Sequence, residues 1–429
     1  MNATGSGRAL AFRGRCVLAK ALFAVGLLAA GLINPGLVAG AERSARGPAP
    51  ASAPLQWQGA AFEGDRDALA KLAAAGAKVV RVYSESHAWV LDEAQRLGLK
   101  VVMGLWVGHP RLGFRLDDRE AVERQEQGIR QFVLRYRAHP ALLAWGVGNE
   151  VELAQTDPLP AWREVDRLAG IVKALDAAHP TMMTVSDHSD EDLRLLAGCC
   201  PHVDLLGVNV YAGGLFEILP RLRAAGVKKP VVIAEFGPLG QWQAGHKPWG
   251  APIEPTSTEK AAYFRDALTF LAREPQVKGA FPFLWGAKLE QTETWHGLLL
   301  GDGSLTGMTD ALSAAWGKRI SAPAPVIRGI GIAADEFAPG QEISAGVDAA
   351  SFDGSPLRTE WKVLTESVGR RPDSDHEPPL ERMAVRVLHE DAASVRFMAP
   401  ERPGAYRLYI TLRDRNGKAA TANLPFLVR

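Results

Sequence analysis

Residues 230–237 read Pro-Val-Val-Ile-Ala-Glu-Phe-Gly, an apolar run that reaches the carboxylate of Glu235 before it ends. An uninterrupted apolar run of this length is typical of a strand that is buried on both faces of a parallel sheet. Residues 259–273, which follow, have the periodicity of a helix, and Thr256 with Glu259 forms a capping box at its start. The stretch therefore predicts one β/α unit whose strand carries a glutamate at its carboxyl end.

The same alternation of short apolar runs and helical segments extends from residue 55 to residue 318. Strands are predicted at residues 56–62, 78–83, 100–106, 142–148, 182–186, 203–210, 230–235 and 279–285. These eight units match a (β/α)8 TIM barrel, which typically has about 250 residues. An open doubly wound sheet, the alternative, normally carries a glycine-rich phosphate loop after its first strand, and residues 62–65 do not form one. We therefore assign the α/β class and place a barrel domain at residues 55–321.

After residue 321 the pattern changes to short strands without helices, separated by turn signals such as Asp353-Gly354 and Asn416-Gly417. Strands are predicted at residues 326–333, 342–349, 358–365, 384–388, 394–398, 404–413 and 419–428. Such a series indicates a small β-sandwich of the immunoglobulin-like type at residues 322–429. Trp361 is its single tryptophan, so we expect a structural accessory domain rather than a carbohydrate-binding face of stacked aromatics.

The N-terminal residues have the composition of an export signal. Basic residues precede an apolar run at residues 21–32, and Ala39-Gly40-Ala41 offers a cleavage pattern of small residues. The basic residues are Arg8, Arg13, Arg15 and Lys20. An uncleaved anchor is the weaker interpretation, because about 20 apolar residues are needed to span a bilayer and Asn34-Pro35 interrupts this run. We expect a signal peptide at residues 1–41, a linker at residues 42–54, and an exported protein, periplasmic or secreted, with no stable membrane insertion after cleavage.

Charge and cysteine content exclude several classes of partner. The chain has 49 basic and 48 acidic residues, a formal net charge of +1, which gives no electrostatic reason to expect nucleic acid or an acidic membrane surface as a partner. Outside the signal the cysteines are Cys199 and Cys200, and adjacent cysteines cannot connect distant parts of a fold. Even with His202 they fall short of the roughly four ligands of a zinc site. We therefore expect a neutral partner, no metal and no cofactor.

In a barrel of this kind the working side chains lie at the carboxyl ends of the strands, where the βα loops form the mouth. The sequence places these residues there: Arg81, Tyr83, Trp106, His109, Asn149, Glu150, Asp187, His188, Asn209, Tyr211, Glu235 and Trp285. Glu150 follows the fourth predicted strand and Glu235 ends the seventh. Their carboxyl groups should therefore face each other across the pocket.

Two carboxyl groups that face each other can cleave a glycosidic bond. One donates a proton to the departing sugar oxygen and needs a raised pKa, while the other attacks the anomeric carbon and must be ionised. Neither glutamate is specific by itself, since an isolated Asn-Glu pair is as readily a surface feature. A charged residue that closes a buried strand is either solvated at the mouth or acts there, and two such residues together favour a catalytic pair.

Further motifs accompany this pair in the order of the strands. They are Val80-Arg81-Val82-Tyr83, Trp145-Gly146-Val147-Gly148-Asn149-Glu150, Gly207-Val208-Asn209-Val210-Tyr211, Ile233-Ala234-Glu235-Phe236-Gly237 and Phe283-Leu284-Trp285. On these motifs, most of residues 55–318 resembles the (β/α)8 glycoside hydrolases of clan A, closest to the catalytic domain of glycoside hydrolase family 2 and related β-1,3-glucan hydrolases and transglycosylases. In family 2, β-domains usually precede the barrel, whereas this sandwich follows it. The exo-specificity of family 2 is therefore not carried over, and internal or terminal cleavage stays open.

The resemblance implies a retaining O-glycosyl hydrolase, or a transglycosylase, that cleaves β-glycosidic bonds in a neutral poly- or oligosaccharide. A β-glucan is the first expectation, and a mannan or galactan comes next. Glu150 would be the general acid/base and Glu235 the nucleophile. Asn149 would bind the hydroxyl next to the anomeric carbon, and Arg81 and Tyr211 would hydrogen-bond Glu235. For Tyr211 a packed aromatic is an equally good interpretation.

Aromatic residues in the predicted mouth loops suit sugar rings, whose C–H faces stack on indoles. The resemblance places Trp285 under the sugar as the floor of the pocket. Trp106 and His109 are further candidates for substrate binding, although an isolated tryptophan more often packs in a core. Other aromatic and imidazole residues in these loops are Trp242, Trp249, Trp295, His188, His246 and His296.

Other classes of protein fit the sequence less well. Ser186-Asp187-His188 are adjacent and cannot form a catalytic triad, and no Gly-x-Ser-x-Gly elbow occurs. A metal-dependent hydrolase that uses His109, Asp187 and His188 lacks a His-x-x-x-His pairing. The alternative that stays open is a non-catalytic glycan-binding or scaffold protein of an envelope polysaccharide system, because a fold does not guarantee activity.

Overall fold

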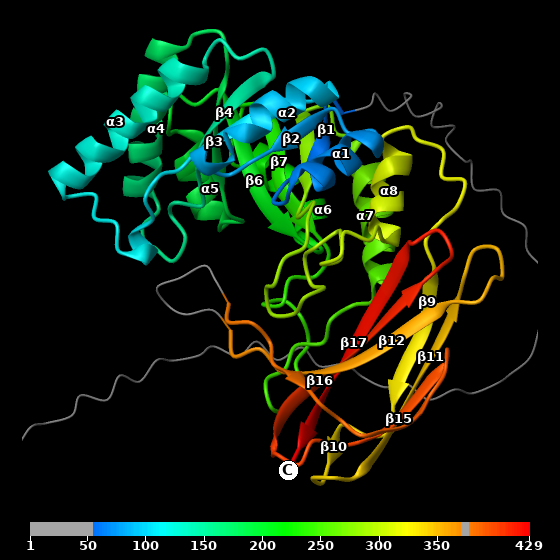
Figure 1. Cartoon of the computed structure of the whole chain (residues 1–429). Helices are drawn as coiled ribbons and strands as arrows, with labels where there is room; N and C mark the ends of the chain where they lie inside the picture. Colours follow the sequence, from blue (N-terminus) through cyan, green and yellow to red (C-terminus); the bar gives the residue numbers. More distant parts are fainter. Residues whose placement is uncertain (1–54, 370–376) are drawn as a thin grey trace, which may run out of the picture. The chain divides into compact units, whose positions relative to one another are not determined.

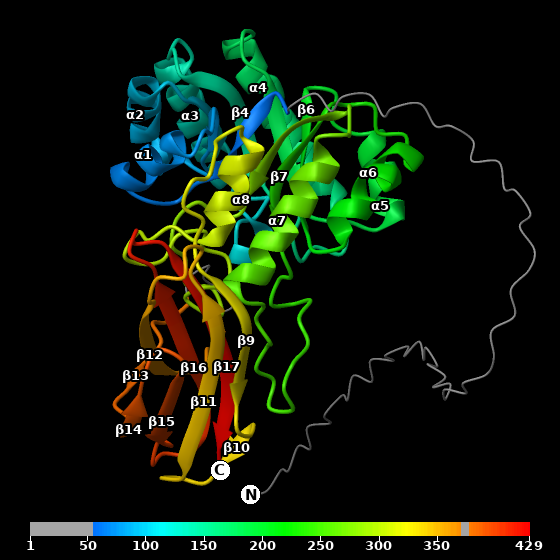
Figure 2. The same cartoon turned by 90° about the vertical axis from the view of Figure 1, so that its right-hand side faces the viewer.

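The computed structural model describes residues 55–369 and 377–429. The predicted signal peptide and linker therefore lie outside the described residues. Figures 1 and 2 show two kinds of architecture along the chain, strands surrounded by helices up to α8 and strands alone from β9 onward. Among the described residues, no helix is long and apolar enough to cross a membrane.

The closed barrel predicted from the sequence is confirmed: eight strands form the ring in chain order. Neighbouring strands are parallel, and β1 closes the ring against β8. The strands are β1 (Trp57–Ala61), β2 (Val79–Arg81), β3 (Lys100–Leu105), β4 (Leu142–Asn149), β5 (Thr181–Val185), β6 (Leu205–Tyr211), β7 (Val231–Gly237) and β8 (Val277–Pro282). Parallel closure brings the carboxyl ends of these strands to one mouth.

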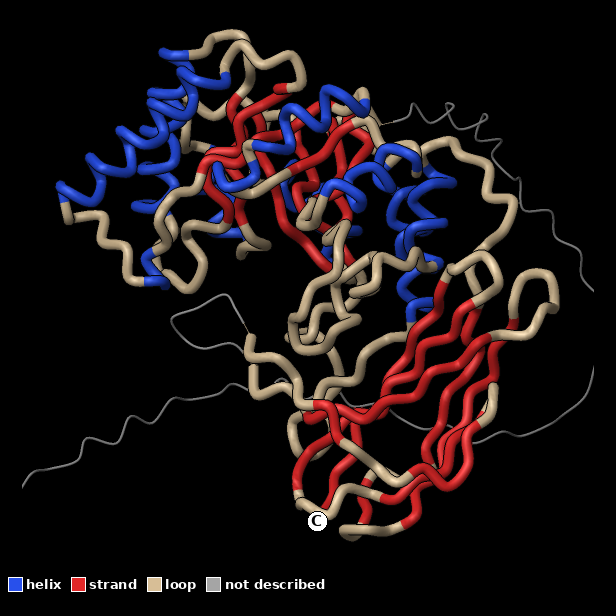
Figure 3. The backbone as a smooth tube through the Cα atoms, in the orientation of Figure 1, coloured by secondary structure: helices blue, strands red, loops and turns tan. Residues whose placement is uncertain are grey.

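Helices surround this ring, as Figure 3 shows. They are α1 (Arg66–Ala74), α2 (Trp89–Leu97), α3 (Arg119–Tyr136), α4 (Leu159–Leu175), α5 (Asp190–Ala197), α6 (Gly214–Ala224), α7 (Ser257–Leu271) and α8 (Gly307–Ala315), with short 3-10 helices η1 (Glu85–His87) and η2 (Pro110–Leu112). The main hydrophobic core joins helix and strand residues, and a smaller cluster contains residues of the strands and strand ends. The predicted capping box of α7 is confirmed, because Thr256 Oγ1 accepts the Glu259 N–H and Glu259 Oε2 accepts the Thr256 N–H.

The C-terminal strands form two sheets, ordered β10-β17-β16-β12-β13 and β14-β15-β11-β9. Their bounds are β9 (Val326–Ile332), β10 (Glu336–Phe337), β11 (Glu342–Ala350), β12 (Arg358–Thr365), β13 (Arg382–Met383), β14 (Val387–Glu390), β15 (Ser394–Met398), β16 (Gly404–Arg413) and β17 (Ala419–Val428). Residues of both sheets, including Trp361, share one hydrophobic core, as the sandwich prediction requires. The strand predicted at residues 384–388 lies instead at β14, whose residues are all exposed and therefore lack a buried alternation. The domain boundary at residue 321 stays a prediction.

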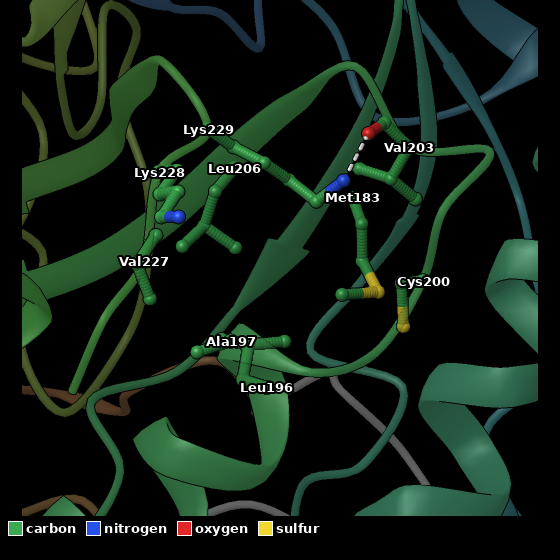
Figure 4. Close-up of a pocket in the computed structure, with 9 residues that line it drawn as sticks. All are labelled: Met183, Leu196, Ala197, Cys200, Val203, Leu206, Val227, Lys228 and Lys229. Carbon is green, nitrogen blue, oxygen red and sulfur yellow. Dashed lines mark hydrogen bonds between the residues drawn. The ribbon is translucent and has the colours of Figure 1, made fainter.

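A small apolar cavity of about 20 Å³ lies beside β5 and β6 (Figure 4). Two of its lining residues are Val203, which precedes β6, and Lys229, which precedes β7. Lys229 Nζ donates to the Val203 carbonyl at 2.7 Å. Cys200, which also lines the cavity, is bonded to Cys199. This volume suits roughly one water molecule, and the cavity lies at the amino ends of the strands, away from the mouth.

Candidate active site

Glu150 and Glu235 lie at the carboxyl ends of β4 and β7, where the sequence predicts them. Glu235 is within β7, pairs in register with Asn209 of β6, and is 6% exposed. Glu150 follows β4 directly, and its N–H donates to the carbonyl of Thr184 in β5 at 2.9 Å. Its φ of 50° is in the left-handed region, which is uncommon for a residue other than glycine. The chain therefore leaves the strand at Glu150, at the rim of the mouth.

Three donors converge on the carboxylate of Glu235. Arg81 Nη1 lies 3.2 Å and the Tyr83 hydroxyl 2.9 Å from Oε1, and the Tyr211 hydroxyl lies 3.0 Å from Oε2. Burial raises the pKa of both tyrosines well above the ordinary value, so their hydroxyls keep their protons and donate. The carboxylate of Glu235 thus accepts hydrogen bonds from one guanidinium and two hydroxyl groups, which fix its orientation.

The surroundings of Glu150 have the opposite effect. Burial, the charge of Glu235 and the charge of Glu152 raise the pKa of Glu150 to about 8. A hydrogen bond from Asn209 and the charge of Arg81 act in the other direction but do not outweigh these causes. At neutral pH Glu150 therefore holds a proton, whereas Glu235 has partners that match a negative charge.

The side chain of Asn149 is fixed by two hydrogen bonds that its amide oxygen accepts. Arg81 Nη2 donates to Asn149 Oδ1 at 2.7 Å, and Asn209 Nδ2 donates to the same atom at 3.1 Å. This leaves Asn149 Nδ2 as a donor next to Glu150. Asn209 Oδ1 is buried and has no hydrogen-bond partner among the described residues. The two amides thus offer one donor and one acceptor at the carboxyl ends of β4 and β6.

The predicted role of Trp285 as the floor of the pocket is wrong. Its side chain is fully buried in the core between strands and helices, and its Nε1 donates to the carbonyl of Ala68 in α1 at 2.8 Å. Its ring lies 6.2 Å from that of Trp316. The indole therefore points away from the mouth, toward the helical layer, and cannot stack on a sugar.

Phe283, two residues before Trp285, lies beside the glutamate pair, where the sequence predicts Trp285. It is partly exposed, and its ring lies 6.4 Å from Tyr83 and 6.2 Å from Tyr211, edge to face. Because both tyrosines donate to Glu235, Phe283 is the apolar surface directly beside the candidate nucleophile. The sequence signal for it was its place after the eighth strand.

Phe283, Tyr83 and Tyr211 form an aromatic wall beside Glu235. Two long loops extend this aromatic wall. His296, after β8, lies 5.9 Å from Tyr211, and Trp242, after β7, stacks on His296 at 6.0 Å. Burial lowers the pKa of His296 to about 4, so the ring is neutral at pH 7, and its Nε2 is 2.9 Å from Gln241 Oε1. Trp242 is 57% exposed. A tryptophan face is therefore accessible next to the residues that hold Glu235.

Trp106 and His109, also predicted to bind substrate, lie together but outside the contacts of the glutamate pair. Their rings are 4.8 Å apart, His109 is buried, and Trp106 is 42% exposed. Trp106 lines a separate cavity of about 490 Å³. The structure therefore places them beside the mouth rather than at the reacting centre.

Glu152 connects the acid/base candidate to β5. This buried carboxylate accepts the Ser186 N–H at 2.9 Å and lies 2.9 Å from His188 Nε2. Hydrogen bonding to Glu152 helps to raise the pKa of His188, against the effect of burial. Ser186 Oγ lies 3.2 Å from His188 Nε2, but the same nitrogen lies 2.9 Å from Glu152 Oε1, so Ser186 and His188 serve to anchor Glu152, two residues from Glu150.

Side chains of the C-terminal sheets hold the loops that carry Trp242 and His296. Asn423 of β17 donates to Glu254 Oε2 at 2.5 Å, and Arg407 of β16 donates to the Pro252 carbonyl at 2.9 Å. Glu254 in turn accepts Thr294 Oγ1 at 2.9 Å. Both the loop before α7 and the loop after β8 are therefore fixed by buried polar contacts with the sandwich.

The barrel, the carboxylate pair and the aromatic residues beside it are the features in which the chain is similar to TIM-barrel glycosidases. Residues 77–241 match the model of the TIM barrel domain of glycosyl hydrolases family 2. No curated protein sequence matches the chain. The resemblance of the barrel to the family 2 catalytic domain is thereby confirmed.

Solved structures with a similar fold include three β-glucuronidases. A calcium-binding mutant of Bacteroides uniformis β-glucuronidase 2 is 15% identical, with a TM-score of 0.50, over 88% of this chain and 46% of that chain. Bacteroides uniformis β-glucuronidase is 15% identical, with a TM-score of 0.48 and the same coverage. Faecalibacterium prausnitzii β-glucuronidase is 18% identical, with a TM-score of 0.46, over 61% of this chain and 49% of that chain. This chain thus spans less than half the length of these proteins, and the likeness is one of fold.

Proposed function

We propose that the protein is a retaining β-glycosidase, a hydrolase or transglycosylase, in which Glu150 is the general acid/base and Glu235 the nucleophile. The observation that carries this proposal is the contrast between two neighbouring carboxyl groups. Glu235 has three donors, and Glu150 has a pKa raised to about 8. Environments that separate two carboxyl groups in this way identify the ionised and the protonated partner of a glycosidase.

The proposed reaction is a double displacement, which needs one ionised and one protonated carboxyl group. A carboxylate oxygen of Glu235 attacks the anomeric carbon while the bond to the leaving oxygen breaks, and that oxygen takes the proton of Glu150. A glycosyl ester on Glu235 and an ionised Glu150 result. A water molecule, or a sugar hydroxyl in transglycosylation, then attacks the same carbon and gives its proton to Glu150, and the Glu235 carboxylate departs. Each step leaves the pair with the protonation state that the next one needs.

Polar groups around the pair suit a sugar ring. Asn149 Nδ2 can donate a hydrogen bond to a sugar hydroxyl. Asn209 Oδ1, which has no hydrogen-bond partner among the described residues, can accept one from the same hydroxyl. Phe283 and Trp242 provide apolar faces for the C–H surface of the ring. Few polar groups among aromatic walls are the usual composition of a site that orients a small ligand.

Charges near the wall favour a neutral sugar. Lys288 Nζ lies 5.7 Å from the Phe283 ring. Carboxylate oxygens of Glu63 and Glu290 each lie 3.8 Å from the same Lys288 nitrogen. Two carboxylates already face this ammonium group, so a uronate would add a third negative charge. We therefore propose a neutral β-glycan, a β-glucan first and a mannan or galactan next. A β-glucuronide, the substrate class in the names of the similar structures, comes after these neutral glycans.

The export signal is part of the proposal, because a polysaccharide substrate of this kind lies outside the cytoplasm. The measurement is the mature N-terminus of the protein secreted or exported by its host. N-terminal sequencing that begins after residue 41 supports export, and a protein that retains residues 1–41 in the soluble intracellular fraction contradicts it.

The experiment that tests the activity is a panel of aryl β-glycosides (glucoside, mannoside, galactoside, glucuronide), with β-1,3- and β-1,4-gluco-oligosaccharides beside them. NMR of the first product follows the anomeric configuration, and a 2-deoxy-2-fluoro glycoside of the preferred sugar labels the nucleophile. Retention and a label on Glu235 support the proposal. Inversion, or a label elsewhere, contradicts it.

The Glu235→Gln protein separates catalysis from the non-catalytic alternative. If the protein is an enzyme, this variant loses turnover and still binds the glycan. If the protein only binds glycan, wild type shows no turnover on the whole panel and the variant binds as the wild type does.

A further inference from the structure

A cavity lies outside the glutamate pair, beside β3. It has about 490 Å³ and is lined mainly by apolar surface. Its lining comes from η1, the loop after β3, and α3, and consists of Glu85, Trp106, Gly108, Phe114, Arg124, Gln125, Gly128, Ile129 and Phe132. The catalytic proposal makes no use of it.

The cavity combines aromatic faces with hydrogen-bonding groups. Trp106 is 42% exposed although His109 covers one side of its ring. Phe114 and Phe132 supply further apolar surface. A wall of aromatic rings with few polar atoms is the composition that binds the C–H faces of a pyranose.

Gln125 contributes an unused donor. Its Oε1 accepts the Gly108 N–H at 2.7 Å, and a backbone donor at that distance fixes which end of the amide is oxygen. Its Nε2 is buried and has no partner among the described residues. A buried donor without a partner costs free energy unless a ligand or water satisfies it, and a sugar hydroxyl in this cavity is such a ligand.

Two glycines shape the wall of the cavity. A Cβ at Gly108 would come within 2.2 Å of the Phe114 ring, so only glycine lets that ring lie on the loop. A Cβ at Gly128, in the middle of α3, would meet no atom within 4 Å. Glycine inside a helix costs about 1 kcal/mol relative to alanine, and here its consequence is open space in the cavity wall.

The cavity lies at the same end of the barrel as Glu235, because Trp106 directly follows β3 and the carboxyl ends of the parallel strands meet at one mouth. Glu85 lies two residues after Tyr83, whose hydroxyl contacts Glu235, and two residues span at most about 7 Å of chain. Glu85 Oε1 also accepts the Trp106 N–H at 3.1 Å. A chain of sugar units bound at Glu235 can therefore continue over the end of β2 to Trp106.

We infer that this cavity is a second glycosyl subsite, which binds another sugar unit of the same neutral β-glycan through Trp106 and Gln125. The inference rests on the proposed glycosidase function. It predicts that the substrate is an oligo- or polysaccharide rather than a monoglycoside, because a lone sugar at Glu235 leaves the cavity empty.

The test compares an aryl β-monoglycoside with tetrasaccharides of β-1,3-glucan, β-1,4-glucan and β-1,4-mannan. For the preferred tetrasaccharide, Trp106→Ala and Gly128→Phe are expected to lower kcat/KM about tenfold, the scale of one aromatic contact. Activity on the aryl monoglycoside should be unchanged in both variants. Gln127→Phe, an exposed position on the same helix that does not line the cavity, is the control and should leave both substrates unaffected.

Binding to the Glu235→Gln protein is measured in parallel by calorimetry with the same tetrasaccharides. It separates the subsite from the reaction, since Trp106→Ala in that background should weaken binding about tenfold even if no substrate in the panel is turned over. Equal losses on mono- and tetrasaccharide, or unchanged kinetics and binding in both cavity variants, would overturn the subsite. Absence of turnover in wild type, with Trp106-dependent binding, would overturn only the proposed activity.

Discussion

The hydroxyl of Tyr83 donates to Oε1 of Glu235 at 2.9 Å, the oxygen that also faces Arg81 Nη1. Tyr83 and Arg81 are two residues apart at the end of β2, so both side chains point to the same face, and the Arg81 guanidinium lies 4.4 Å from the Tyr83 ring. The pair thus forms one unit that orients Glu235. In the sequence Tyr83 stood among the mouth residues without a role.

Tyr83→Phe removes this hydroxyl and keeps the ring. Glu235 would retain Arg81 and Tyr211, and a hydrogen bond to a charged group contributes about 1.5 to 3 kcal/mol. We expect kcat on the preferred aryl glycoside to fall roughly 10- to 100-fold with the melting temperature nearly unchanged. Tyr136→Phe, at a half-buried tyrosine of α3 outside the contacts of Glu235, is the control. A Tyr83→Phe enzyme with wild-type kcat would show that Tyr83 only packs against Phe283.

The pH dependence follows from the pKa of Glu150, which is raised to about 8. Glu150 must be protonated to donate, so activity persists while the pH is below this value and is lost as the pH rises through it. The alkaline limb of kcat/KM should therefore have its midpoint near pH 8, as measured with an aryl glycoside from pH 4 to 10. A midpoint near the ordinary glutamate pKa would contradict the assignment of Glu150 as the acid.

Glu152→Gln tests the cause of that shift. The charge of Glu152 raises the pKa of Glu150, so its removal should lower the pKa and move the alkaline limb to lower pH. Glutamine retains an oxygen that can accept the Ser186 N–H, which keeps the fold of the loop. Asp157→Asn, an exposed residue farther along the same loop, should leave the limb in place. A shift to higher pH would show that Glu152 acts on Glu150 by position and not by charge.

Phe283 and Trp285 provide a matched pair. Phe283→Ala removes the apolar surface beside Glu235 and should raise KM or lower kcat/KM about tenfold while costing little stability. Trp285→Ala empties a fully buried site and should cost about 3 to 5 kcal/mol in the free energy of unfolding. Urea unfolding and steady-state kinetics separate the two effects. The reverse assignment, with Trp285 in contact with sugar, predicts the opposite pattern.

This pair also shows how far the sequence could lead. Apolar runs that end in a charged residue predict the barrel, the mouth and Glu235, since parallel closure fixes those positions. The family resemblance, and not the strand pattern, implies Arg81 and Tyr211 as partners of Glu235. Phe283 and Trp285 both follow the eighth strand, and periodicity cannot say where the extended backbone ends. The backbone turns between them, so one ring faces the mouth and the other faces α1.

Contacts with the sandwich had no local signal at all. Asn423 and Glu254 are 169 residues apart, and an asparagine in a β-strand gives no indication of its partner. The sequence names Trp106 as a candidate for substrate binding but not the cavity beside it, because Gly128 appears in the sequence as a weak point of a helix rather than as space. Sequence patterns report local structure and burial, whereas these features depend on which elements pack together.

The sandwich should be required for activity, because its side chains hold the loops of the aromatic wall. Burial alone would raise the pKa of Glu254, but Lys260 and its hydrogen-bond partners hold it below the ordinary value, so Glu254 is charged and needs Asn423 as a donor. Asn423→Ala leaves that buried charge with one partner fewer, at a cost of about 1 to 3 kcal/mol.

We expect Asn423→Ala to lower kcat/KM even at temperatures well below its unfolding temperature, because the loop that carries Thr294 and His296 loses an anchor. Asn416→Ala, in an exposed turn of the same domain, should change neither property. Kinetics at a temperature where circular dichroism shows both variants folded make the comparison. If Asn423→Ala is destabilised but has wild-type kcat/KM when folded, the sandwich supports the fold without shaping the active site.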